Sequence, residues 1–452
     1  MDDSKKVILL EFNELCPELL ERFMKSGDLP NFSKLYQSAD VYVTDANCET
    51  EYLEPWIQWV TLHTGLPFEK HQVFRLGQAQ NLKHDSIWDV LAKHNKTSWL
   101  CGSMNTKWDA ADSKITALPD PWSIDVLASP HSLQPFYQFV RANVQEHSNT
   151  NFTLSAGDYV RFFWFMLRHG LSFKTSKKLA AMLWKQLTKA DDRWKKATVL
   201  DWLQFDVFKH IYQQQKPHFA TFFSNSTAHF QHKFWRYMEP EKFPLKPTQA
   251  EIEKYGGAVL HAYKNHDELI GEVFKMADKD TVVILSSALS QQPYTLKDEE
   301  GGKRFYRPHD MQKIPAMFGL TGVQKVSPVM SHQFHLLCES EAAAKDNFER
   351  LQALTFNDGP LFSLRLEGHD VFGGCRIYKE VDPQATLELN GRTLDFHEVF
   401  YLADSLKSGM HHPHGVFWVS QQGRSHQHNA EPIPLELTMP KILQEFQLQP
   451  QD

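Results

Sequence analysis

Short apolar runs of strand length, each followed by polar residues, constrain this chain most. KKVILLE begins at Lys5, HFATFFS covers 218–224 and TVVILS begins at Thr281. Such runs, bounded by polar residues, are typical of strands buried on both faces of a parallel sheet. Helical patterns separate them. The sequence therefore predicts an α/β fold with a central, mostly parallel sheet flanked by helices.

The helical patterns are unevenly distributed along the 452 residues. Aromatic and basic helical stretches with few strand signals dominate 121–210, which we interpret as a helical cap inserted into the core. The flanking parts, 1–120 and 211–452, are predicted to form the N-terminal and C-terminal parts of the α/β core. Within the last part, we expect one long helix over 249–277 and a strand over 317–322.

Composition excludes several classes of protein. With 48 basic and 55 acidic side chains, the net charge of −7 gives no reason to expect nucleic-acid binding. No apolar run approaches the roughly 18 residues of a transmembrane segment, and the first apolar run is too short for a signal peptide. Five scattered cysteines without a CxxC indicate a reducing compartment. We therefore expect a cytoplasmic protein; its oligomeric state stays open.

One segment in the expected cap leaves two interpretations open. YVRFFWFMLR, at 159–168, is strongly apolar but is interrupted by arginines. It is typical of a buried amphipathic helix, and it also suits a helix that faces a membrane or covers a substrate cleft.

Four segments carry motifs of a known family. They are VILLEFNEL with GDLPNFSKL (7–15 and 27–35), WIQWVTLHTG (56–65), AHFQHKFWRY (228–237) and HHPHGVF (411–417). In this order they resemble the type I phosphodiesterase/nucleotide pyrophosphatase branch of the alkaline phosphatase superfamily. The resemblance implies an α/β fold, two divalent metals at the carboxyl ends of the strands and a Thr or Ser nucleophile.

Position by position, the resemblance implies a degenerate two-metal site. The first metal-binding Asp falls on Asn13, and the nucleophile falls on Pro55, which has no hydroxyl group. The Asp of the third motif falls on Ala228. Two metal-binding histidines remain, at His232 and His411. The sequence thus departs from the family's covalent phospho-enzyme mechanism, unless the alignment shifts and Thr50 takes the nucleophile's role.

A second metal-binding pair of the family, Asp-His, falls on Ser287 and Ala288. The loop that follows is neutral and polar. Neutral hydrogen-bonding groups suit a sugar or another polyhydroxylated ligand better than a cation. We therefore expect Ser287, Gln291 and Gln292 to bind substrate, unless this loop has simply lost its role.

Histidines support a smaller metal site. His229 and His232 are three residues apart and share one face if they lie on a helix. With His411 they would form a three-histidine site for one divalent metal, zinc or manganese, which lowers the pKa of a bound water. Alternatively, His229 is only a neighbour of a ligand position, and the other two are relics of the family site.

Acidic residues provide candidates for the missing nucleophile's role. Glu11, Asn13 and Glu14 lie where the first strand ends, the usual place for binding residues in an open α/β sheet, and we predict catalytic roles for Glu11 and Asn13. Glu54 precedes the nucleophile position and is our candidate general base, for a water or a sugar hydroxyl. Glu51 and Trp56 are candidate substrate contacts. Acidic residues also occur here simply because they favour a helix N-terminus.

Three functional hypotheses follow. The first is an atypical hydrolase or transferase of the superfamily acting on a small phosphate ester or a glycan-type substrate. The second is a catalytically inactive protein that binds a nucleotide or sugar. The third is a metal-free enzyme of surface polysaccharide metabolism. Metal content and turnover of a phosphodiester separate the first hypothesis from the others.

Overall fold

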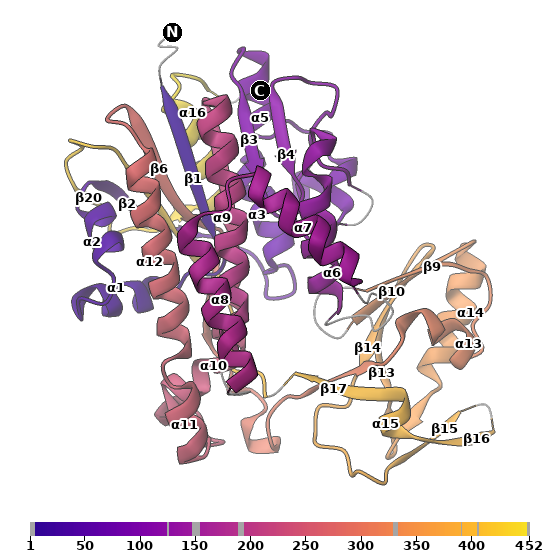
Figure 1. Ribbon diagram of the computed structural model, residues 1–452. Helices are drawn as coiled ribbons and strands as arrows, with labels where there is room; N and C mark the ends of the chain where they lie inside the picture. The colour runs from indigo at the N-terminus through magenta and orange to yellow at the C-terminus, as the bar shows by residue number, and fades with distance from the viewer. Residues whose placement is uncertain are drawn as a thin grey trace.

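The computed structural model describes residues 5–123, 126–146, 154–188, 194–328, 333–389, 391–404 and 406–449. Its centre is a nine-stranded sheet (Figure 1). The strands of the main path, in spatial order, are β20 (Gln427–His428), β2 (Ala39–Asp45), β19 (His414–Ser420), β6 (Thr281–Ser287), β1 (Lys6–Phe12), β5 (Phe219–Ser224), β3 (Ser98–Cys101) and β4 (Ile115–Leu118). A short β21 (Ile433–Pro434) also pairs with β2.

The sheet is parallel except where β19 runs antiparallel to β2 and β6. At its centre, Glu11 of β1 lies level with Phe223 of β5 and Ser286 of β6. The predicted fold class is confirmed. Its basis is the complete burial of β1, β5 and β6 between two layers of side chains, which makes these strands nearly continuous apolar runs.

Side chains alternate between two cores along β1. Ile8 and Leu10 face a core shared with one set of helices, while Val7 and Leu9 face another. The first set comprises α1 (Pro17–Lys25), α2 (Pro30–Gln37), α9 (Lys196–Gln215), α10 (Ser226–Met238) and α12 (Ala258–Met276). The second comprises α3 (Pro55–Thr64), α5 (Ile87–Lys93) and α16 (Thr438–Gln444). Helices therefore cover both faces of the sheet, and α4 (Phe68–His71) follows α3.

Helices α6 (Gln134–Glu146), α7 (Ala156–Arg168) and α8 (Phe173–Thr188) lie within the expected cap, before α9. The prediction of a single helix over 249–277 is wrong. It is divided into α11 (Gln249–Tyr255) and α12, with Gly256 and Gly257 between them. A Cβ at position 256 would lie 2.7 Å from the carbonyl oxygen of Ile252, so the close approach at this junction requires glycine.

A smaller antiparallel module lies within the expected C-terminal part, at the lower right of Figure 1. Its four-stranded sheet has the order β13 (Phe362–Glu367), β14 (Asp370–Cys375), β10 (Gln333–Cys338) and β9 (Val323–Pro328). Its other elements are β8 (Phe305–Pro308), α13 (Ile314–Met317), α14 (Glu341–Gln352), β11 (Thr355–Phe356), β12 (Gly359–Pro360), β15 (Thr386–Leu389), β16 (Arg392–Asp395), α15 (Phe396–Val399) and β17 (Phe400–Asp404). The module has its own hydrophobic core.

The strand expected over 317–322 does not form. Helix α13 ends at Met317, and both Gly319 and Gly322 then adopt left-handed φ angles of 66° and 64°, which no regular strand accommodates. An ion pair between Arg75 and Glu367 ties the module to the main part of the chain, and the Arg75 guanidinium lies 3.4 Å from the Phe372 ring centroid. Among the described residues, no helix is both long and apolar enough to cross a membrane.

Candidate functional site

Polar residues gather where β1 ends. The turn after this strand contains Asn13 and Glu14, and Glu14 has a left-handed φ of 61°. Few residues other than glycine adopt this conformation, and those that do are frequent at functional sites. A two-stranded antiparallel sheet of β7 (Ser290–Pro293) and β18 (Gly409–His412) lies beside it, with His411 paired to Gln291. Helix α10 completes the group with His232.

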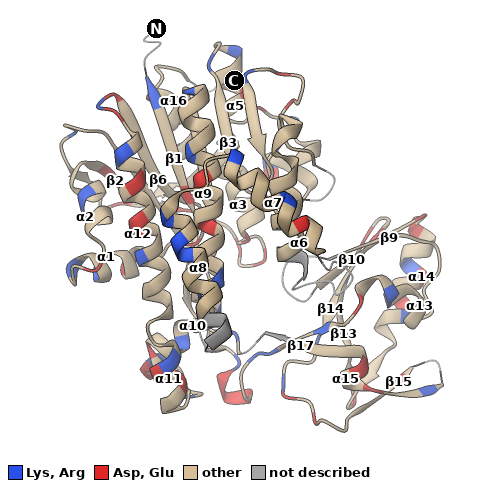
Figure 2. Cartoon of the chain, in the orientation of Figure 1, with Lys and Arg blue, Asp and Glu red and all other residues tan. Residues whose placement is uncertain are grey.

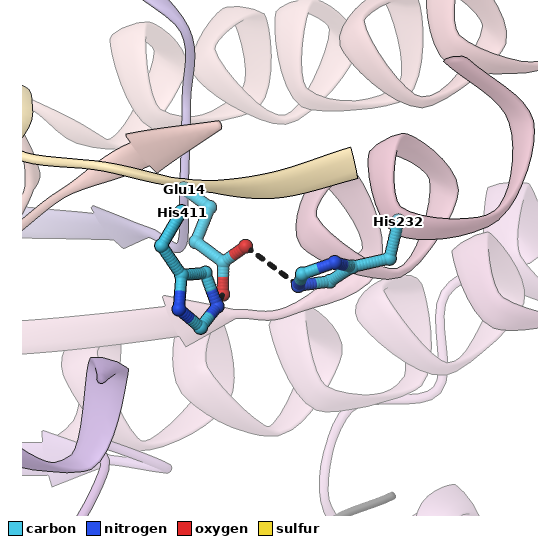
Figure 3. A group of neighbouring side chains, drawn as sticks. All are labelled: Glu14, His232 and His411. Atoms are coloured by element: carbon cyan, nitrogen blue, oxygen red, sulfur yellow. Dashed lines mark ion pairs between the residues drawn. The ribbon is translucent and has the colours of Figure 1, made fainter. Parts of the chain in front are cut away.

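The buried carboxylate of Glu14 lies between two imidazole rings (Figure 3). Its Oε2 is 3.0 Å from Nε2 of His232, and its Oε1 is 3.5 Å from Nε2 of His411. One ligand atom from each of the three residues can be chosen so that all lie within 4.8 Å of one another. In the described part of the chain, this is the only group of three or more His, Cys, Asp or Glu side chains that could hold a metal ion.

Further hydrogen bonds orient these side chains. Nδ1 of His232 donates to the carbonyl oxygen of Gly409 at 3.1 Å, which leaves Nε2 directed at Glu14. The Asn13 amide donates to Oε1 of Glu14 at 3.1 Å, and the Gln291 amide donates to its Oε2. Metal-binding histidines usually donate their second N–H to a carbonyl or carboxylate in this way.

Charges in the group stabilise one another. Burial acts to raise the pKa of Glu14, but His232 and His411 outweigh it and hold this pKa well below its usual range. Burial also acts to lower the pKa of His411, but the Glu14 carboxylate outweighs it and raises the pKa to about 8. Without a metal, the group therefore holds a carboxylate against a protonated imidazole near neutral pH.

Glu54 and Lys407 extend the site. Oε2 of Glu54 is 3.6 Å from Nδ1 of His411. Burial raises the pKa of Glu54 despite the attraction of His411 and Lys407. Burial lowers the pKa of Lys407, and the Coulombic effects of Glu54 and Glu14 oppose this shift. The sequence analysis missed Lys407, because no motif surrounds it and only the fold brings it close to these carboxylates.

Two of the predicted catalytic residues have structural partners. Asn13 accepts a hydrogen bond from the Trp59 indole at 2.8 Å and donates to Oδ1 of Asn225 at 2.8 Å. Glu11 is fully buried, and its Oε1 is 2.6 Å from Nε2 of His63 on α3. Both residues thus fix α3 against the end of β1, and Asn13 also supports Glu14.

The expected substrate contacts on the polar loop face inward. Ser287 is fully buried, accepts a hydrogen bond from the Leu15 amide at 3.0 Å and donates to the Leu289 carbonyl at 2.6 Å. Gln291 is buried and bonded to Glu14, while the Gln292 amide donates to the His411 carbonyl at 3.2 Å. This loop positions the Glu14–His411 pair.

The remaining candidates lie outside the Glu14–His232–His411 group. His229 is exposed, one turn of α10 before His232. Glu51 is exposed in the loop before α3. Trp56 is partly buried, and its indole donates to the carbonyl oxygen of Phe74 at 3.0 Å.

The sheet and the residues at its edge define an α/β protein with a candidate metal centre at the ends of β1 and β18. The chain belongs to the type I phosphodiesterase / nucleotide pyrophosphatase family, whose sequence profile matches residues 7–302. This family is part of the alkaline phosphatase superfamily. No curated protein matches the chain.

Several solved structures are similar to this chain. One is the phosphonoacetate hydrolase of Sinorhizobium meliloti 1021 in complex with phosphonoformate, with 10% identity, coverage of 96% of this chain and 94% of that chain, and a TM-score of 0.45. Another is human ectonucleotide pyrophosphatase / phosphodiesterase 5, with 10% identity, coverage of 99% and 96%, and a TM-score of 0.46. Its murine counterpart, in an inactive form with AMP, has 9% identity, the same coverage and a TM-score of 0.46.

The residues present suit one divalent metal rather than the two that the family resemblance implies. Two imidazoles and one carboxylate are a donor set used by catalytic zinc, and the Nδ1 bond of His232 supplies the usual supporting contact. The second position does not suit a metal. The Ser287 hydroxyl is hydrogen-bonded to two backbone groups, and the side chain of Ala288 has no ligand atom.

The raised pKa of His411 makes a prediction for the metal-free protein. A histidine whose pKa rises from 6.5 to about 8 on folding contributes stability that is complete below pH 6.5 and is lost as the pH rises through 8. We expect a loss of up to about 2 kcal/mol over this window. Urea unfolding in chelator at a series of pH values measures it. In His411→Gln this part of the slope should vanish; an unchanged slope contradicts the pairing.

Proposed function

We propose that this protein hydrolyses a phosphate ester, most directly a phosphodiester, with one zinc or manganese ion held by Glu14, His232 and His411. The convergence of these three side chains at the strand ends carries the proposal. Family membership supports the reaction class. When bound, the metal supplies a Lewis acid for the phosphoryl oxygens and a water of lowered pKa.

Glu54 is our proposed general base. A proline follows it where the family has its nucleophile, so a water molecule must attack the phosphorus directly. Because the pKa of Glu54 is raised, it lies closer to neutral pH, and a general base is most effective when its pKa is near the working pH. Nδ1 of His411, 3.6 Å away, orients the carboxylate. If a sugar hydroxyl replaces the water, the same arrangement catalyses transfer to a glycan.

Charge favours an anionic substrate. Glu14 is compensated by its two histidines, and the partly buried Lys407 adds a positive charge near Glu54. A phosphoryl group that approaches this site meets a cation in a partly dehydrated setting, where electrostatic stabilisation is strong. The inward-facing Ser287 and Gln291 supply no free sugar contacts. We therefore propose that recognition rests on the phosphate.

Metal content and turnover test this function. The purified protein should contain about one equivalent of zinc or manganese and should hydrolyse bis(4-nitrophenyl) phosphate. His232→Ala should lose the metal and at least about a hundredfold in kcat/KM. The matched control is His229→Ala, one turn away and exposed, which should keep both. Absence of metal together with absence of turnover contradicts the proposal and favours a protein that only binds its ligand.

A second variant tests the base. Glu54→Gln should lower kcat by about a hundredfold or more while metal content stays unchanged, because only proton transfer is removed. The acidic limb of the pH–rate profile should disappear with it. Glu49→Gln, an exposed carboxylate in the same loop, is the control and should behave like the native protein. If Glu54→Gln keeps the native kcat and pH profile, Glu54 is not the base.

A further inference from the structure

Helices α7 and α8 expose large apolar side chains. On α7, these are Tyr159, Val160, Phe163, Trp164 and Leu167, each between 47% and 57% exposed. On α8, Phe173 is 87% exposed, and Leu183 and Trp184 are 50% and 70% exposed. We call these eight residues, together with the exposed Arg168 and Lys177 of the same helices, the α7–α8 surface. Apolar clusters of this kind on a folded protein usually mark an interaction site.

The outer stripe of α7 is separate from its packed face. Its members follow the spacing i, i+1, i+4, i+5 and i+8, which places them on one side of a helix. The opposite side is buried against α6, where the rings of Phe162 and Phe139 stack with centroids 3.7 Å apart. Tyr159, at one end of the stripe, also contacts Phe139 edge-on, with ring centroids 5.4 Å apart. The rest of the stripe is additional to what this packing requires.

The same two helices are strongly basic. Residues 156–188 contain six Lys or Arg side chains and one Asp, in a chain with a net charge of −7. Basic positions recur along α7 and α8 in Figure 2. Arg161 contacts Asp158, while Lys174 and Lys178 contact Glu268 of α12 and lie over the Trp202 ring. Arg168 and Lys177 are exposed and supply the positive charge of this surface among the described side chains.

We propose that the α7–α8 surface docks on an anionic lipid bilayer. Exposed Trp, Tyr and Phe side chains flanked by Lys and Arg are the composition of helices that lie in the membrane interface. The described helices include none that crosses a membrane, which fits attachment at the surface. A second copy of this chain is a poorer occupant, because two equal faces of this charge would repel each other.

Vesicle co-sedimentation tests this docking. The full chain should sediment with vesicles of phosphatidylcholine and phosphatidylglycerol in equal parts. It should bind pure phosphatidylcholine vesicles less, and the difference should shrink as salt is added. The double variant Phe163→Ser/Trp164→Ser should lower partitioning by at least about tenfold, because it removes two aromatic anchors. Lys177→Glu should lower it for the anionic vesicles alone.

Leu296→Ser is the matched control, since Leu296 is 70% exposed on a loop between β7 and β8 and should leave partitioning unchanged. Unchanged melting temperatures and unchanged turnover of a dissolved phosphodiester show that the variants are folded. The proposal is overturned if the native chain does not sediment with anionic vesicles or if the double variant sediments equally well. A third result would also overturn it: the native chain does not bind vesicles but forms a concentration-dependent dimer, and the double variant abolishes that dimer.

Discussion

Glu14→Gln should lower the affinity for zinc by at least about a hundredfold, and turnover should fall with it. The carboxylate is the one negative charge between His232 and His411, and its loss leaves both imidazoles without their partner. In the native protein, the amides of Asn13 and Gln291 both donate to the Glu14 carboxylate. A glutamine has only one acceptor oxygen, so its own N–H would face one of these donors. Competitive titration with a chromophoric chelator measures the affinity.

Two further variants interpret this result. Glu18→Gln removes an exposed carboxylate of the next helix and should leave zinc binding intact. Glu14→Asp keeps the charge but withdraws it by one methylene, so its affinity should fall between those of the native protein and Glu14→Gln. Native affinity in Glu14→Gln would mean that the metal is held elsewhere.

Asp298→Ala should destabilise the protein by about 3–5 kcal/mol, the cost of leaving a buried cation without its partner. Arg236 of α10 donates to both carboxylate oxygens of Asp298, at 2.6 and 2.8 Å, and both side chains are almost completely buried. The same guanidinium donates to the carbonyl oxygens of Leu245 and Lys407. The pair thus fixes the segment that leads into β18.

Urea unfolding of the metal-free protein measures this loss. Glu300→Ala removes an exposed carboxylate from the same short segment and should leave the unfolding midpoint unchanged. Arg236 also holds the backbone at Lys407, shortly before β18 and His411. Loss of its partner should therefore disturb the site, and Asp298→Ala should also raise KM for a phosphodiester. Native stability in Asp298→Ala would show that Arg236 finds sufficient partners in backbone carbonyls alone.

Strands buried on both faces were predictable from the sequence, because most positions of such a strand are apolar. β1, β5 and β6 show this as short runs that are apolar except near their ends and at a few hydroxyl side chains. The antiparallel module was not predictable in the same way. β13 alternates exposed residues with residues that are mostly only partly buried, over only six positions, and glycines interrupt β14, so the sequence signal is weak.

The candidate site was likewise predictable from the sequence only in part. His232 and His411 were expected to lie together because each carries a motif, and the structure places both beside Glu14. No carboxylate was expected in this metal site, because the family's first metal-binding Asp falls on Asn13. The next residue, Glu14, has a left-handed φ and places its own carboxylate in the group. Such a φ angle leaves no signature in a single glutamate, so sequence reasoning placed Glu14 near the site but assigned it no role.

The connection between β7 and β18 also bears on how the protein folds. Gln292 and His411 are hydrogen-bonded although they lie 119 positions apart, with the whole antiparallel module between them. Closing so long a loop is slow when the intervening chain is unstructured. The module has its own core and a pairing of β8 with β17 near its two ends, so its folding shortens the loop in advance. We therefore expect the module to form first, the pairing of β7 with β18 second and the Glu14–His411 contact last.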